Sequence, residues 1–385
     1  MAATDNHFKL TMLVFGLLFV TSLHLTAGQV GTFFGRLGTN LPGPAATVSL
    51  YQQNNIRRMR LFDPHAPTLR ALGGTNTRLM MGVSHSDLRD LANCPQAATA
   101  WVRRNILRFP NVTFRYVIVG NEIDPNSELG PFVFPAMQNV YRAIRAAGQG
   151  GRIQVSTSIQ INLLSRWSPP QAAEFKCSVN WFIRPILEFM RDTGASVHLN
   201  VFPFYAYLND RRNINLSFAL LQPNSGVVLG GVYYDNLFYV IHDAFIAAMT
   251  KILAAASPLS LQQQGGGPQQ KPDMPTGLES TISTGISSGG GNAAPAPQGS
   301  IPFDDGERNT TALSDGPIST LNNARTYINN LMRVVRTGTP MRPGRPMQTY
   351  IFAMFDENLR PGPEYERHFG IFLPNGQPKF PFRFQ

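Results

Sequence analysis

Short apolar runs alternate with longer segments of helical periodicity along most of the chain. The runs are rich in β-branched and aromatic residues, which is typical of buried strands, and they fall at residues 29–35, 56–62, 77–83, 114–123, 153–159, 196–202 and 347–355. Apolar residues recur at helical spacing within residues 97–109, 137–144, 181–191, 236–255 and 321–335. Regular alternation of this kind predicts an α/β fold, in which helices cover a parallel sheet.

One long segment, residues 257–318, interrupts this alternation. It contains QQQGGGPQQ, SSGGG and APAPQG, so it is rich in Gly, Pro, Gln and Ser and poor in apolar residues. Such a composition does not bury enough apolar surface to order the chain. The segment lies where the alternation requires a seventh strand, and we therefore expect that strand to be degenerate or disordered.

The first 28 residues have the features of a secretory signal peptide. Lys9 precedes an apolar run at residues 10–20, and small residues at 26–28 offer a cleavage site. An uncleaved signal anchor is the alternative, but the apolar run is short for one. We expect residues 29–385 to form a single domain that is secreted to the cell wall or apoplast, with the vacuole as an alternative. We expect no other membrane-spanning segment.

The composition of the chain limits its size class and the kinds of partner and cofactor that we expect. With 385 residues, of which 43% are hydrophobic, it is long enough for one large barrel or two domains. The formal net charge is +10, but the basic residues are scattered and form no nucleic-acid motif, which favours weak attraction to an acidic cell wall over nucleic-acid binding. The seven histidines lack ligand spacing, so we expect no metal and no other cofactor. We also expect a monomer.

Export would allow two covalent modifications. Cys94 and Cys177 could pair outside the cell, but two cysteines do not make a disulfide scaffold, and stability must come from the core. Asn111, Asn215 and Asn309 each begin an Asn-X-Ser/Thr sequence and are candidate glycan acceptors.

The strongest catalytic candidate is a carboxylate at the end of a buried strand. Residues 114–123 read FRYVIVGNEI, an apolar run that ends abruptly in Gly-Asn-Glu. A carboxylate at such a strand end is costly unless water or a partner meets it. In a (β/α)₈ barrel the carboxyl ends of the strands form the active-site rim. Glu122, with Asn121 beside it, is therefore the best candidate, and an exposed acid that opens the next helix is the alternative.

Several segments together resemble a known family of plant enzymes. They read VGTFFGRLGTNLP, MRLFDP, FRYVIVGNEI, IQVSTSI, NVFPFYAY, NARTYINNL, TYIFAMFDEN and HFGIFLPNGQPKF, and they occur in order. The chain resembles plant glycoside hydrolase family 17, the endo-β-1,3-glucanases. The resemblance implies a (β/α)₈ (TIM) barrel with catalytic glutamates after strands four and seven and a retaining mechanism. In that mechanism one carboxyl protonates the glycosidic oxygen, while the other attacks the anomeric carbon.

The resemblance also implies roles for individual residues. Glu122 matches the proton donor, and Asn121 matches its neighbour, which contacts the sugar next to the scissile bond. Glu357 matches a further glutamate that supports the substrate, and a solvated loop acid is the alternative. Phenylalanines stand where the family has cleft tyrosines, and we expect their rings to stack on sugars without hydroxyl hydrogen bonds: Phe34, Phe62, Phe202 and Phe204.

The nucleophile is the largest departure from the family pattern. The chain has no Ser-Glu-Ser/Thr-Gly-Trp-Pro-like motif, and its last tryptophan is Trp181. Glu279 is the candidate that the remaining sequence offers, with an exposed loop acid as the alternative and Glu307 as a weaker candidate. Either the gene has diverged here, or the segment is a mistranslated or mis-spliced piece of an ordinary glucanase gene.

Two functions follow from these features. One is a secreted, retaining endo-β-1,3-glucanase that acts on wall glucans, with a place in plant defence. The other is a catalytically impaired barrel that binds β-1,3-glucan and lacks a proper nucleophile. A third outcome is a chain that does not fold stably, because removing one strand would open two edges of the barrel.

Overall fold

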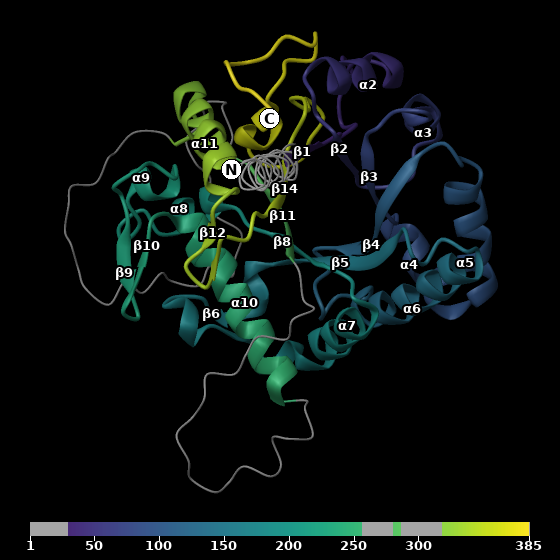
Figure 1. Cartoon of the computed structure of the whole chain (residues 1–385), viewed down its shortest axis with the longest axis horizontal. Helices are drawn as coiled ribbons and strands as arrows, with labels where there is room; N and C mark the ends of the chain where they lie inside the picture. Colours follow the sequence, from purple (N-terminus) through teal and green to yellow (C-terminus); the bar gives the residue numbers. More distant parts are fainter. Residues whose placement is uncertain (1–29, 256–279, 286–317, 385) are drawn as a thin grey trace, which may run out of the picture.

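The fold is a closed barrel of parallel strands surrounded by helices. The computed structural model describes residues 30–255, 280–285 and 318–384 (Figure 1). The strands follow one another around the barrel in the order β1-β14-β11-β8-β5-β4-β3-β2. Their bounds are β1 Val30–Phe33, β2 Arg58–Leu61, β3 Arg78–Gly82, β4 Thr113–Asn121, β5 Gln154–Gln160, β8 Val197–Asn200, β11 Ser280–Thr284 and β14 Gln348–Ile351. The (β/α)₈ prediction is confirmed.

The seventh strand is present, so the expectation of a degenerate strand is wrong for residues 280–284. β11 pairs with β8 through Ser283 and Asn200, and with β14 through Thr284 and Ile351. Its sequence, STIST, is rich in β-branched residues, and Ile282 is fully buried. The neighbouring strands β8 and β14 satisfy the backbone of this short strand on both sides. The flanking parts of the low-complexity segment lie outside the described residues.

Helices surround the barrel in the described part of the chain (Figure 1). Their bounds are α2 Pro44–Gln53, α3 Ala66–Leu72, α4 Leu88–Asn93, α5 Pro95–Val102, α6 Gly130–Ala146, α7 Asn180–Thr193, α8 Pro203–Asn209, α9 Leu216–Ala219, α10 Leu237–Ala255 and α11 Leu321–Val334. Each apolar stripe that predicted a helix is confirmed, although the stripe at 97–109 divides into α5 and a π-helical turn, η2 Arg103–Leu107. Within the described residues, three hairpins lie outside the barrel sheet: β6 Leu164–Arg166 with β7 Glu174–Phe175, β9 Val227–Leu229 with β10 Val232–Tyr234, and β12 Gly338–Thr339 with β13 Arg342–Pro343.

Helix α10 corrects the expectation that no other segment is long and apolar enough to cross a membrane. By length and composition it passes that test, but 83% of its most apolar window is buried inside the protein. A helix that is apolar on all sides and covered by its neighbours belongs to the core of a large domain. The signal-peptide prediction concerns residues 1–28, which lie outside the described residues.

The predicted modification sites lie at the surface where the structure describes them. Cys94 and Cys177 are both exposed, and neither forms a disulfide. Asn111 is exposed, and Asn215 is exposed at the start of α9, where its side chain accepts a hydrogen bond from the backbone of Ser217. Asn309 lies outside the described residues.

Candidate active site

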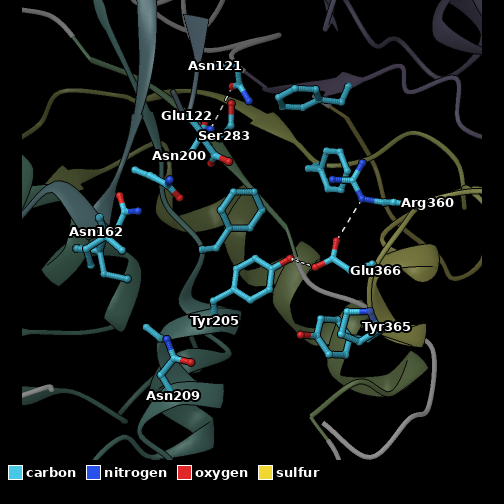
Figure 2. Close-up of a pocket in the computed structure, with 18 of the residues that line it drawn as sticks. Asn121, Glu122, Asn162, Asn200, Tyr205, Asn209, Ser283, Arg360, Tyr365 and Glu366 are labelled. Atoms are coloured by element: carbon cyan, nitrogen blue, oxygen red, sulfur yellow. Dashed lines mark hydrogen bonds and ion pairs between the residues drawn. The ribbon is translucent and has the colours of Figure 1, made fainter. Parts of the chain in front are cut away.

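A cavity of about 570 Å³ opens at the carboxyl ends of the barrel strands. Its aromatic lining consists of Phe33, Phe62, Trp167, Phe202, Tyr205, Phe352 and Tyr365. Polar groups also line it, among them Asn121 and Glu122 from the end of β4 and Asn200 from the end of β8 (Figure 2). Aromatic faces combined with a few fixed polar groups are typical of a site that binds a small molecule or a sugar chain.

The backbone at the end of β4 turns Glu122 into the cavity. The pairing of β4 with β5 shifts between Ile118 and Asn121, which marks a bulge. Gly120 and Glu122 both have positive φ angles, of 79° and 54°. A left-handed conformation costs a residue other than glycine roughly 1–3 kcal/mol, and such strain is found at functional sites. Hydrogen bonds to β5 hold the turn, because the Glu122 amide donates to the Ser158 carbonyl at 3.0 Å.

The environment of the Glu122 carboxyl favours its protonated form. The side chain is partly exposed at the cavity wall, but the protein surrounds it closely, and desolvation raises the pKa of Glu122 above its usual range. Glu366 raises this pKa further, whereas Asn200 lowers it by donating a hydrogen bond from Nδ2 to Oε1 at 2.7 Å. The charges of Arg60 and Arg360 also lower it. A carboxyl whose pKa is raised in this way is suited to act as a general acid.

Beneath the cavity floor lies Arg60, a residue of β2 with 2% of its surface exposed. Burial lowers the pKa of Arg60 to about 10, so the guanidinium remains charged at neutral pH. Its Nη2 donates to Asn121 Oδ1 at 2.7 Å and to Ser158 Oγ at 2.8 Å. Its Nη1 donates to Ser283 Oγ and, at 3.5 Å, to Asn200 Oδ1. Arg60 thus ties together the rim ends of β4, β5, β8 and β11.

The opposite wall carries a second charged cluster. Glu366, from the short helix η7 Glu364–His368, accepts a hydrogen bond from the Tyr205 hydroxyl at 2.5 Å. Arg360 Nε lies 3.2 Å from the other oxygen of Glu366, and the guanidinium lies 4.4 Å from the centre of the Phe352 ring. Figure 2 shows this cluster across the cavity from Glu122. Both carboxyl oxygens of Glu366 are therefore engaged.

The structure brings four of the predicted site residues to the cavity and leaves three behind it. Asn121, Glu122, Phe62 and Phe202 line it. Phe34, Phe204 and Glu357 are absent from the lining, and all three are buried.

Glu357 is held by the protein behind Arg360 and is not itself part of the cavity lining. Its Oε1 accepts a hydrogen bond from the Leu37 amide at 2.7 Å, and its Oε2 lies 3.5 Å from Arg360. A Cβ on Gly35 would lie only 2.2 Å from this carboxylate, so a larger residue there would displace the Glu357 side chain. Glu357 therefore supports Arg360 and the first βα loop, and the alternative of a solvated loop acid is wrong because its exposed fraction is 3%.

A retaining reaction needs a second carboxylate beside Glu122, and β11, whose sequence is STIST, does not supply one. Ser283 occupies the rim end of this strand and lines the cavity close to Glu122 (Figure 2). Among the residues that the structure describes, the carboxylates in the lining are Glu122 and Glu366. Glu279 and Glu307, the two candidate nucleophiles, lie outside the described residues. The role of Glu279 stays a prediction.

Sequence reasoning missed several polar residues of this site. Asn200 ends a strand as Asn121 does, which is a signal that was available in SVHLNVF. Arg60 is a charged residue inside the predicted strand IRRMRLF, where burial requires a special environment. Tyr205, Glu366 and Trp167 lie in loops or short helices, and only the folded chain brings them to the cavity.

Comparisons with known proteins agree on one family. A sequence profile described as "Glycosyl hydrolases family 17" matches residues 30–257 and 311–384. A probable glucan endo-1,3-beta-glucosidase of Arabidopsis thaliana is 38% identical over 97% of this chain and 96% of its own length. Glucan endo-1,3-beta-glucosidase B of Solanum lycopersicum is 36% identical over 97% of this chain and 92% of its own length. Residues 258–310 of the chain, which include β11, lie between the two matched stretches.

Solved structures give the same assignment. A beta-1,3-glucanase and allergen of Cryptomeria japonica pollen superimposes with a TM-score of 0.77 at 33% identity, over 92% of this chain and 99% of its own. One of two plant beta-glucan endohydrolases with distinct substrate specificities superimposes with a TM-score of 0.76 at 33% identity, over 92% of this chain and 100% of its own.

Proposed function

The chain belongs to glycosyl hydrolase family 17, and on that premise we propose that it binds β-1,3-glucan in the rim cavity and uses Glu122 as the proton donor to the glycosidic oxygen. The carrying observation is the position of Glu122 at the end of β4, in an aromatic-lined cavity that favours its protonated form. The Cryptomeria japonica relative is described as a beta-1,3-glucanase, which supports the choice of substrate, and the other solved relative is described as a beta-glucan endohydrolase. The relatives named endo-glucosidases support cleavage within the glucan chain.

The aromatic residues supply the binding surface in this proposal. Phe62 and Phe202 line the cavity and lack the hydroxyls that tyrosines would carry. Apolar ring faces exclude water from the sugar, and each hydroxyl that is absent removes one hydrogen bond worth roughly 0.5–1.5 kcal/mol. Asn121 is held by Arg60 and is available at the cavity wall beside the proton donor. We expect a glucan site of modest affinity.

Retention and export also belong to the proposal. Retention requires a second carboxyl about 5–5.5 Å from that of Glu122. Glu279 is the sequence-based candidate, and Glu279→Gln tests it by the loss of laminarin cleavage.

Export is supported by the apolar run at residues 10–20, and the size of the chain recovered from the medium of an expressing plant cell tests cleavage before residue 29.

A second candidate function is a barrel that binds β-1,3-glucan without hydrolysing it. The observation that favours it is Ser283, a neutral residue at the rim end of the seventh strand. The two candidates predict the same ligand and differ in turnover.

One experiment separates these possibilities. Binding of laminari-oligosaccharides is measured by calorimetry and release of reducing ends from laminarin by a colorimetric assay, with cello-oligosaccharides as the matched β-1,4-linked control. The proposal predicts preferential binding of the β-1,3-linked ligand and cleavage that Glu122→Gln abolishes. Binding without any cleavage supports the second candidate. Failure to bind either oligosaccharide contradicts both.

A further inference from the structure

Arg60 is a buried cation whose side-chain hydrogen-bond partners within the described part of the chain are all neutral. Among the described residues they are Asn121, Ser158, Asn200 and Ser283. The guanidinium also lies 4.3 Å from the centre of the Phe33 ring. Moving a charge from water into a protein interior costs several kcal/mol, and an opposite charge normally compensates it. Glu122 is the carboxyl whose charge acts on Arg60, and burial raises the pKa of Glu122, so its surroundings disfavour the charged form that would compensate the buried cation.

Ser283 connects this charge to the cavity. Its Oγ accepts a hydrogen bond from Arg60, and the hydroxyl hydrogen of Ser283 can still be donated to a second partner. Since Ser283 lines the cavity, that hydrogen is available to an acceptor there (Figure 2). An anion at this position would take a hydrogen bond from Ser283 and feel the Arg60 charge through a medium of low dielectric constant. Asn200 holds the Glu122 carboxyl beside the same position.

Apart from Glu122, the described lining offers no carboxylate at this place. Glu366, the other carboxylate of the lining, receives hydrogen bonds from Tyr205 and Arg360 on the far wall. A serine side chain is also smaller than a glutamate, so it leaves room for a small ion. The floor of the cavity therefore combines a buried positive charge, a free hydroxyl donor and space.

We propose that the cavity floor at Ser283 is a binding site for a small monovalent anion of the carboxylate or azide class, and that this anion acts as an external nucleophile in glycosyl transfer. The inference rests on the proposed function. A lone pair of the anion forms a bond to the anomeric carbon while the bond from that carbon to the glycosidic oxygen breaks. The departing oxygen takes the proton of Glu122, which water later restores. Azide yields an α-glycosyl azide, and formate yields an α-glycosyl formate that water hydrolyses.

The test uses the full chain and a dinitrophenyl β-laminarioside, whose leaving group needs no proton. Release of dinitrophenolate is followed with azide, with formate and with chloride at equal ionic strength. Azide and formate are expected to raise the rate saturably, because binding holds the nucleophile next to the anomeric carbon. NMR of the azide product is expected to show the α configuration. Chloride is expected to have no effect.

Two matched variants locate the site. Ser283→Glu supplies a built-in carboxylate at the proposed anion site and is expected to lose the rate response to azide and to formate. Ser165→Glu makes the same chemical change at an exposed position on β6 and is expected to keep the response of the original chain. Circular dichroism checks that both variants fold.

The outcomes separate this inference from the proposal on which it rests. If the chain binds laminari-oligosaccharides but azide and formate leave the rate unchanged, the anion site is refuted and the proposed glucan function stands. A β-configured azide product, or an azide response that survives in Ser283→Glu, also refutes it. Loss of laminari-oligosaccharide binding by the original chain contradicts the proposed function itself.

Discussion

Strand β11 allows a direct test of the structure by protein stability, because the sequence did not predict an ordered strand at this place in the barrel. Ile282 lies in the middle of β11 and is fully buried between β8 and β14. Ile282→Ala removes three carbon atoms from the core. At about 0.8 kcal/mol for each buried carbon, the transfer term is about 2.4 kcal/mol. The cavity left behind adds to this, so we expect a loss of about 2.5–5 kcal/mol in the free energy of unfolding.

The assay is urea unfolding followed by circular dichroism and tryptophan fluorescence. The control is Val228→Ala, because Val228 lies on the β9–β10 hairpin with 61% of its surface exposed. This control is expected to change the free energy of unfolding by no more than about 0.5 kcal/mol. An Ile282→Ala variant as stable as the original chain would show that β11 does not close the barrel, and Ser283 would lose its assigned place at the rim.

Three further predictions follow from the surroundings of the site. Gly35→Ala should lower the free energy of unfolding by about 1–3 kcal/mol, because its Cβ would overlap the Glu357 carboxylate. Gly43→Ala is the control, since a Cβ there meets nothing within 4 Å, and the urea unfolding midpoints of the two variants are compared. Asn200→Ala removes a hydrogen bond that favours ionised Glu122, so NMR titration of labelled glutamate should show the pKa of Glu122 rising further, and a fall would contradict this. Because the pKa of Glu122 is raised in the folded state, its contribution to the free energy of unfolding is present at acid pH and is lost as pH rises from the usual 4.5 through the raised value. Over that rise, Glu122→Gln should become increasingly more stable than the original chain in urea unfolding. The same pH dependence in both proteins would contradict the raised pKa.

The barrel was predictable from the sequence because its signals are local. Each of the seven predicted strands is a compact apolar run, and the helical stripes between them have regular spacing. β11 was missed because five residues, STIST, stand between long stretches rich in Gly, Gln, Ser and Pro, and the composition of the whole segment hid them. This strand owes its order to β8 and β14, which are distant in sequence. Tertiary context of this kind overrides local composition.

The site was predictable only in part. Glu122 and Asn121 carry a local signal, since they follow a buried strand directly, and the structure places both at the cavity. Phe34 and Phe204 match family positions along the chain, but the path of the backbone buries them behind the lining. The link from Arg60 to Ser283 joins β2 to β11, and no sequence pattern contains such a contact.

The central claim is that Glu122 gives its proton to the departing glycosidic oxygen, and the most direct test is how the cleavage rate depends on the leaving group. Aryl β-laminariosides with strongly and weakly acidic phenols are compared in the original chain and in Glu122→Gln, in a buffer that contains formate. The account predicts that Glu122→Gln keeps its rate on the dinitrophenyl compound, which needs no proton, and loses on the order of 100-fold or more on the weakly acidic phenols. An equal loss on every leaving group would contradict the role of Glu122 as proton donor.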